Sequence, residues 1–264
     1  MKKILYLFLV VAVFGMQSCF KIDNWDEPDC TFHGTVIDSY TNEPLLASQN
    51  DWQIRIWERT WTGHDGGATS QQDLRIKQDG SYKNSKLFAG TYDMLPYDGP
   101  FWPADTLKNV VLKGTTKQDF KVTPYLQVID FNTRLEKNAN GRDVLYLTCR
   151  LKAPRTEGLP NLRYVQAFLS LSTFCGNGSN SYISIAEYTN GPDGSRGRID
   201  INRSWANEMN ATGMNPNGDT SKEYTIGPLP LNAGYTYHVR IGASVNVGSN
   251  RFCYSPIKEI QVPK

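Results

Sequence analysis

The stretch Asp-Trp-Gln-Ile-Arg-Ile-Trp at residues 51–57 predicts a β-strand with one buried face. Large apolar side chains occupy every second position, and polar side chains stand between them, which is the period of two that strands show. One face is predicted to carry Trp52, Ile54 and Ile56, and the other Gln53, Arg55 and Trp57. We therefore expect the first set to pack in a core and the second set to face outward.

Segments of similar character recur along the chain, separated by turn residues. They include residues 31–38, 87–95, 119–122, 144–151, 163–172, 236–245 and 254–262. Asp79-Gly80, which follows the alternating segment Leu74-Arg75-Ile76-Lys77 and Gln78, predicts a hairpin turn. Only residues 204–211 suggest a helical turn, with Ser204 as its N-cap. The predicted fold class is therefore all-β.

The length suits two domains, and Thr123-Pro124 is the predicted boundary between them because proline ends strand pairing. Residues 31–123 are predicted to form one β-sandwich and residues 124–264 a second. The last two strands of the second unit are spaced like those that close immunoglobulin and fibronectin type III sandwiches. The sequence thus predicts two sandwiches in tandem.

The first residues have the layout of an export signal. Lys2 and Lys3 precede an apolar run from Ile4 to Phe14, which is too short to span a bilayer. We expect residues 1–18 to be a lipoprotein signal peptide and Cys19 to carry the lipid; an ordinary cleaved signal is the alternative. Residues 19–30 are acidic and contain proline, so they are expected to form a flexible tether.

The other cysteines fall at wide spacing, and no C-x-x-C pair suggests a zinc site. Export permits a disulfide, and Cys149, Cys175 and Cys253 in the second unit allow three pairings. Buried free thiols are an equally good interpretation of these residues and of Cys30. The sequence leaves this choice open.

Several local patterns resemble a known family. Gly34-x-Val36-x-Asp38 followed by residues 41–45, and Asp79-Gly80-Ser81-Tyr82 followed by residues 87–92, resemble carboxypeptidase-regulatory-like domains of the transthyretin type. Together with the lipoprotein start, the chain resembles a Bacteroidota outer-membrane lipoprotein family of unknown function, whose members are encoded beside glycan importers of the starch-utilisation type.

The resemblance implies a location and partners. It implies a lipid-anchored protein of the outer membrane that faces the cell exterior, near an importer or a glycan-binding lipoprotein. The acidic residues after Cys19 resemble the signal for this surface location. The family brings no catalytic residue and no cofactor, so none is carried over.

No catalytic or metal-binding motif is present. His33, His64 and His238 lack the paired spacing of metal ligands, and no G-x-S-x-G elbow occurs. The runs at 190–195 and 215–219 could hold calcium, but turns explain them better. The net charge of +2 gives no support to nucleic-acid binding. We expect a protein that is not an enzyme and has no cofactor or metal. The alternative is a glycosidase or other hydrolase, since two of the 26 acidic residues could face each other across a cleft.

Aromatic residues are the remaining functional signal. Those predicted to bind a ligand are Trp57, Trp61, Tyr97, Phe101 and Trp102. Flat rings on rigid loops suit stacking against the C–H face of a sugar, and they suit protein interfaces as well. The predicted function is therefore polysaccharide binding as an accessory to glycan import. The alternative is a structural spacer that binds a neighbouring import protein, with these rings filling the boundary between the domains.

Overall fold

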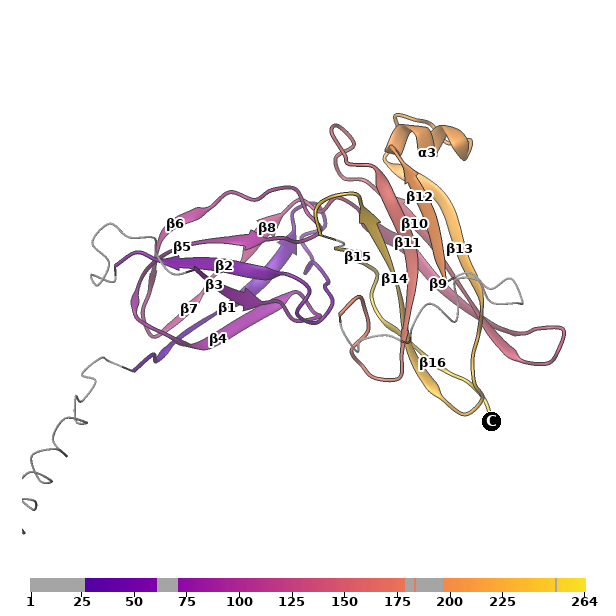
Figure 1. Ribbon diagram of the computed structural model, residues 1–264, viewed down its shortest axis with the longest axis horizontal. Coiled ribbons are helices and arrows are strands. Elements are labelled where there is room, and N and C mark those ends of the chain that lie inside the picture. The colour runs from indigo at the N-terminus through magenta and orange to yellow at the C-terminus, as the bar shows by residue number, and fades with distance from the viewer. Residues whose placement is uncertain (1–26, 61–70, 179–182, 184–196, 250) are drawn as a thin grey trace, which may run out of the picture.

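The computed structural model describes residues 27–60, 71–178, 183, 197–249 and 251–264. The regular secondary structure of the described chain is almost entirely β-strand, as the sequence predicts, and the strands form several sheets arranged as β-sandwiches. Strands β1 to β8 lie between residues 30 and 122 and make up the first domain; strands β9 to β16 lie between residues 127 and 261 and make up the second. The two domains stand end to end (Figure 1).

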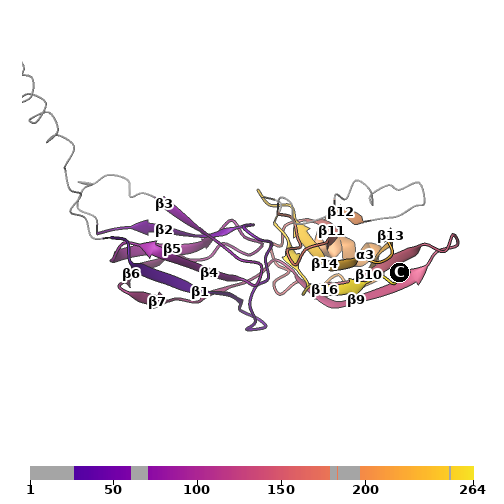
Figure 2. The ribbon, with the colours of Figure 1, turned by 90° about the horizontal axis from the view of Figure 1, so that it is seen from below.

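Two four-stranded sheets form the first domain, and Figure 2 shows them as two layers. One sheet has the order β4-β1-β7, with β8 also pairing with β1; the other has the order β3-β2-β5-β6. The strands are β1 (Cys30–Asp38), β2 (Gln53–Glu58), β3 (Gln71–Arg75), β4 (Ser81–Leu87), β5 (Gly90–Tyr97), β6 (Leu107–Leu112), β7 (Thr115–Lys117) and β8 (Phe120–Val122). Strand β1 begins at the end of this domain that is remote from the second domain.

The core between these layers contains the side chains predicted from the alternation in β2. Trp52, Ile54 and Ile56 are fully buried. Burying side chains of this size contributes about 2 kcal/mol each before the cost of ordering the chain. Arg55 and Trp57 point to the other face and are only partly buried, so the predicted phase of β2 is confirmed. Gln53, which was also expected to face outward, is buried, and its side chain accepts a hydrogen bond from Arg75.

A three-stranded sheet of order β13-β10-β9 and a five-stranded sheet of order β12-β11-β14-β15, in which β16 also pairs with β14, form the second domain. The elements are β9 (Gln127–Lys137), β10 (Asp143–Lys152), β11 (Leu162–Ser170), β12 (Arg198–Arg203), α3 (Trp205–Ala211), β13 (Thr220–Pro230), β14 (Thr236–Val245), β15 (Cys253–Tyr254) and β16 (Lys258–Gln261). The predicted final strand is split into β15 and β16 around Pro256.

The one helix among the described residues begins where the sequence predicts. The Ser204 side chain accepts a hydrogen bond from the backbone N–H of Asn207, 3.4 Å away. This cap satisfies one of the N–H groups that a helix leaves unpaired at its start.

The hairpin predicted at Asp79-Gly80 is absent. The turn itself forms, because Gly80 adopts a φ of 79° and its N–H bonds to the Lys77 carbonyl 3.0 Å away. Strand β3 before the turn pairs with β2, however, and β4 after it pairs with β1. The turn therefore carries the chain from one layer of the sandwich to the other, and a local turn signal cannot distinguish this connection from a hairpin.

Contacts across the junction fix the two domains together. The Gln78 side chain donates to the Thr173 carbonyl at 2.9 Å and accepts from the Cys175 N–H at 2.8 Å. Arg240, which is 1% exposed, donates to the Ala47 carbonyl at 2.7 Å and lies over the Tyr254 ring. Polar groups buried with such partners resist separation because each would lose its hydrogen bond. In the described part of the chain, no helix has both the length and the apolar character needed to cross a bilayer.

Candidate binding face

The solvent-facing side of the β3-β2-β5-β6 sheet brings two of the predicted residues together. Trp57 on β2 lies opposite Asp93 on β5, and Gln53 on β2 lies opposite Tyr97 on β5. Because side chains alternate between faces, Trp57 and Tyr97 point to the same side. They are four residues apart along the strands, which corresponds to about 13 Å at roughly 3.3 Å per residue.

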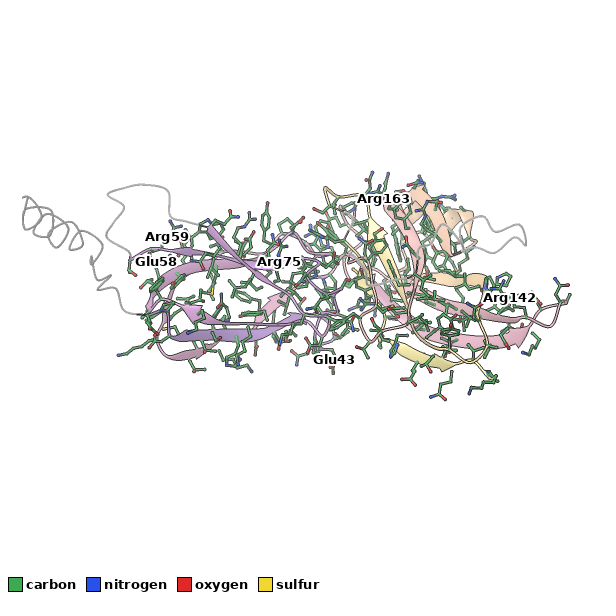
Figure 3. All side chains as sticks on the ribbon, turned by 60° about the horizontal axis from the view of Figure 1, so that its bottom comes forward. Glu43, Glu58, Arg59, Arg75, Arg142 and Arg163 are labelled. Carbon is green, nitrogen blue, oxygen red and sulfur yellow. The ribbon has the colours of Figure 1, made fainter. Side chains whose placement is uncertain are left out.

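We call this surface the aromatic face. It consists of Gln53, Arg55 and Trp57 from β2, Gln71, Asp73 and Arg75 from β3, and Asp93, Leu95 and Tyr97 from β5. Its inward counterparts, Leu74 on β3 and Met94 on β5, are in the core. Arg59, just beyond β2, and Arg75 mark two ends of this side of the first domain, Arg59 toward the free end and Arg75 toward the second domain (Figure 3).

Charged groups hold the centre of the aromatic face in place. Arg55 makes two parallel hydrogen bonds to Asp73, with Nε to Oδ1 at 2.8 Å and Nη2 to Oδ2 at 3.0 Å. The hydrogen bond from Arg55 lowers the pKa of Asp73, and the hydrogen bond to Asp73 raises the pKa of Arg55. Both groups therefore stay ionised, and such a two-point pair fixes the plane of the guanidinium.

Tyr97 completes this arrangement. The Arg55 guanidinium carbon lies 3.6 Å from the centre of the Tyr97 ring, so the two planar groups stack. Tyr97 remains 41% exposed. The result is a rigid ring with one side supported and the rest accessible, which is what a sugar-stacking residue requires.

A second ion pair lies at the opposite end of the aromatic face, beside Trp57. Asp93 accepts hydrogen bonds from the Asn109 N–H at 3.0 Å and from Arg59 Nε at 2.8 Å. The hydrogen bond from Asn109 is the largest cause of the lowered pKa of Asp93, and Arg59 adds to it. A fixed carboxylate and a guanidinium thus flank the Trp57 side as well. Hydrogen-bonding groups around a partly exposed ring suit the hydroxyls of a sugar.

The other predicted residues of the loop after β5 lie elsewhere. Phe101 is 5% exposed and its ring packs edge-on against Trp52, with centroids 5.1 Å apart. This placement corrects the expectation for Phe101: a backbone bridge to Pro124 draws it into the core, and its ring has no face open to a ligand.

Trp102 packs at the junction of the domains. Its ring lies 5.2 Å from Tyr125 and 4.4 Å beneath the guanidinium of Arg155, and it contacts the core of the second domain. Its Nε1 is buried and has no hydrogen-bond partner among the described residues. Trp102 therefore fills the boundary, which was the alternative interpretation of these rings. Trp61 and Cys19 lie outside the described residues.

The first domain is similar to a known protein family. Residues 30–123 match the family model for the N-terminal domain of DUF3823, a protein family of unknown function. The aromatic face lies entirely within these matched residues. A search of the curated proteins found no match.

Solved structures extend the likeness to both domains. A Bacteroides uniformis protein described as "a putative carbohydrate binding protein" is 27% identical, with 89% of this chain and 100% of that chain covered and a TM-score of 0.67. DUF3823 proteins from Bacteroides uniformis (21% identity, TM-score 0.62) and Parabacteroides merdae (17%, 0.59) cover the same shares, 89% of this chain and 100% of their own. The last two share the fold.

A hollow of about 400 Å³ opens at the edge of the first domain beside Trp102. It is lined by Pro96, Trp102, Pro103, Ala104, Asp105, Thr106 and Leu107 on one side and by residues 118–123 on the other. Its lining mixes apolar and polar groups, with exposed Asp105 and Thr106 at the rim. No local sequence pattern predicts this hollow, because its two sides come from separate segments of the chain.

Neither the histidines nor the carboxylates of the described residues form a metal site, since no three His, Cys, Asp or Glu side chains gather there. His238 lies 3.9 Å from Glu259, and His64 is outside the described residues. Residues 215–219 form a turn, in which the Gly218 N–H bonds to the Asn215 carbonyl at 2.9 Å. The run at 190–195 lies outside the described residues.

Proposed function

We propose that this chain binds polysaccharide through the aromatic face of its DUF3823 domain, without catalysis, as a lipid-anchored outer-membrane protein accessory to glycan import. The observation that carries the proposal is the shared face of Trp57 and Tyr97, on which the Arg55–Asp73 pair also joins β2 to β3. The similarity to the "putative carbohydrate binding protein" supports it. A flat face of this length suits a chain of sugars better than a single one.

The location is part of the proposal. A lipid on Cys19 and a tether to residue 30 would attach the chain at the end of the first domain where β1 begins, which is remote from the second domain (Figure 1). The DUF3823 domain would then stand near the membrane and the second domain would project outward. Palmitate labelling that is lost in Cys19→Ser tests this attachment.

Affinity gels test the binding directly. The purified two-domain chain without its signal should be retarded by at least one of soluble starch, laminarin, xyloglucan and arabinoxylan. Trp57→Ala with Tyr97→Ala should remove that retardation. Tyr235→Ala, which truncates a ring of similar exposure on the second domain, should keep it. Equal retardation of the double variant and the native chain would contradict the proposal.

A structural spacer is the second candidate, and the closed junction favours it. Gln78 and Arg240 hold the domains in one arrangement across the boundary. A fixed rod of two sandwiches suits a protein that holds a neighbouring importer or binding protein at a set distance. Co-purification of an outer-membrane protein from native membranes, with no polysaccharide retarding the chain, would favour this candidate over the first.

A further inference from the structure

The aromatic face ends at Asp98, a residue held by the second domain. Asp98 directly follows β5 and has a φ of 59°, a left-handed conformation that Asp tolerates better than most residues. The Ser249 hydroxyl donates to its Oδ1, Arg251 Nη2 donates to its Oδ2 at 2.6 Å, and Arg251 Nε donates to its carbonyl at 3.0 Å. The conformation after Tyr97 is thus fixed by partners from the second domain.

Arg251 also reaches the neighbouring strand. Its Nη1 donates to Oδ1 of Asp51 at 3.0 Å, and Asp51 lies two residues before β2. Strands β2 and β5 are adjacent, with Gln53 paired directly with Tyr97. One guanidinium therefore links the start of β2 to the end of β5, and the stacked pair Arg55–Tyr97 comes from these two strands.

The surroundings favour the charged form of Asp98, whereas burial raises the pKa of Asp51. The Arg251 side chain is 23% exposed and that of Asp51 only 2%. Burial would raise the pKa of Asp98, but the hydrogen bonds from Ser249 and Arg251 outweigh it and the pKa is lowered. Arg55 adds to this lowering from the aromatic face itself. Hydrogen bonds to ionised groups in such partly dry surroundings are stronger than those on open surface.

We propose that Arg251 of the second domain is a positioning residue for the aromatic face, which sets the orientation of Tyr97 through Asp98 and makes ligand binding depend on both domains. The proposal rests on the proposed function of that face. The second domain then acts as a support that a DUF3823 domain alone would lack, since the side-chain and carbonyl contacts described for Asp98 come from residues 249 and 251.

The experiment compares Arg251→Ala with Gln78→Ala in the two-domain chain. Gln78 is a matched control, because it makes two hydrogen bonds across the same junction but from the turn between the layers. Hydrogen exchange of the free protein is measured over residues 93–99, and affinity is measured with the polysaccharide that retards the native chain most in the gel panel. Arg251→Lys is the conservative variant.

Arg251→Ala should speed exchange over residues 93–99 and weaken binding roughly fivefold, a size usual for coupling through contacts outside a site. Arg251→Lys should recover part of both effects, and Gln78→Ala should change neither. Unchanged exchange over residues 93–99 in Arg251→Ala, or equal effects of Gln78→Ala, would overturn the positioning role. Faster exchange in a protein that no polysaccharide retards would leave the positioning of Tyr97 supported and the proposed function refuted.

Discussion

The guanidinium carbon of Arg55 lies 3.6 Å from the centre of the Tyr97 ring, while its nitrogens bind both carboxylate oxygens of Asp73. A charged plane thus supports an exposed ring from behind. This relationship joins three strands, β3, β2 and β5.

Arg55→Ala is expected to weaken polysaccharide binding roughly tenfold, or about 1.4 kcal/mol, because the Tyr97 ring loses its support. Arg55→Lys should lose nearly as much, since an ammonium cannot both stack and make the two-point bond. Isothermal titration calorimetry measures the change. Arg134→Ala is the control: it removes an arginine that lies 4.9 Å over Tyr146 and pairs with Glu136 on the second domain. A similar loss in Arg134→Ala would show that the effect is not specific to the face.

We expect Asp98 to make the folded protein less stable in acid. Its pKa is lowered in the folded chain from an ordinary value of 3.8, so the unfolded chain binds more protons between the two values. The stabilisation is therefore complete above pH 3.8 and is lost as the pH falls through the folded pKa. Melting temperatures recorded from about pH 6 to about pH 2.5 should fall less steeply for Asp98→Asn than for the native chain. Parallel curves would refute this account.

We expect the domain junction to tolerate replacement of Arg240 by an apolar side chain of similar size. It is buried, burial lowers its pKa, and its Nε has no partner among the described residues. Arg240→Met keeps much of the volume and avoids the desolvation of a charge, but it leaves the Ala47 carbonyl without this donor, so it should cost about 1 kcal/mol in the free energy of unfolding. Arg240→Ala should cost about 3 kcal/mol through the cavity it leaves. Urea unfolding measures both, and equal losses would mean that the charge itself is needed.

We expect that no side chain fits at position 34, because the backbone of residue 118 lies too close. A Cβ there would lie 1.7 Å from the Gln118 carbonyl oxygen and 2.8 Å from the Tyr82 hydroxyl, which donates to that same carbonyl. Gly34→Ala must push β1 away from residue 118, and we expect a loss of about 3 kcal/mol. Gly248→Ala, with nothing within 4 Å of the added atom, should stay within about 0.5 kcal/mol. Thermal unfolding of the two variants gives the comparison, and equal melting temperatures would refute the close approach.

We expect the thiols of the described cysteines to react only after the chain unfolds. Cys30, Cys149, Cys175 and Cys253 are free and buried, and burial raises the pKa of Cys149 to about 12 and that of Cys175 to about 11. A thiol reagent should therefore leave the native chain without its first nineteen residues unmodified and modify these cysteines in guanidinium chloride. Fewer reactive thiols in the denaturant, without a reductant, would indicate a disulfide.

Local order was predictable from the residues. The alternation in β2 placed Trp52, Ile54 and Ile56 in the core, and Ser204 marked the start of the helix. These features depend on neighbours along the chain, and the period of two and the cap are properties of the segment alone. The same locality explains the error at Asp79-Gly80, where the turn was correct and the pairing was not.

The candidate site was predictable only in part. Trp57 and Tyr97 were named from composition and phase, but their shared face follows from the register between β2 and β5. Phe101 and Trp102 are adjacent in the sequence and alike in character, but they pack in different places. Phe101 packs against Trp52 in the core of the first domain, and Trp102 packs against Tyr125 and Arg155 at the domain junction. Such partners are remote in sequence, so no local pattern encodes them.

The sequence by itself determined that the chain is all-β, that Trp52, Ile54 and Ile56 face the core, and that aromatic residues were available for binding. Only the tertiary structure decided which rings remain exposed, because that depends on how the sheets pair and how the second domain closes on the first. Arg251 illustrates the reason. It donates to the Asp51 carboxylate, the Asp98 carboxylate and the Asp98 backbone carbonyl, which lie about 150 to 200 residues away in sequence. Packing brings them within hydrogen-bond distance, and the ends of β2 and β5 are fixed there.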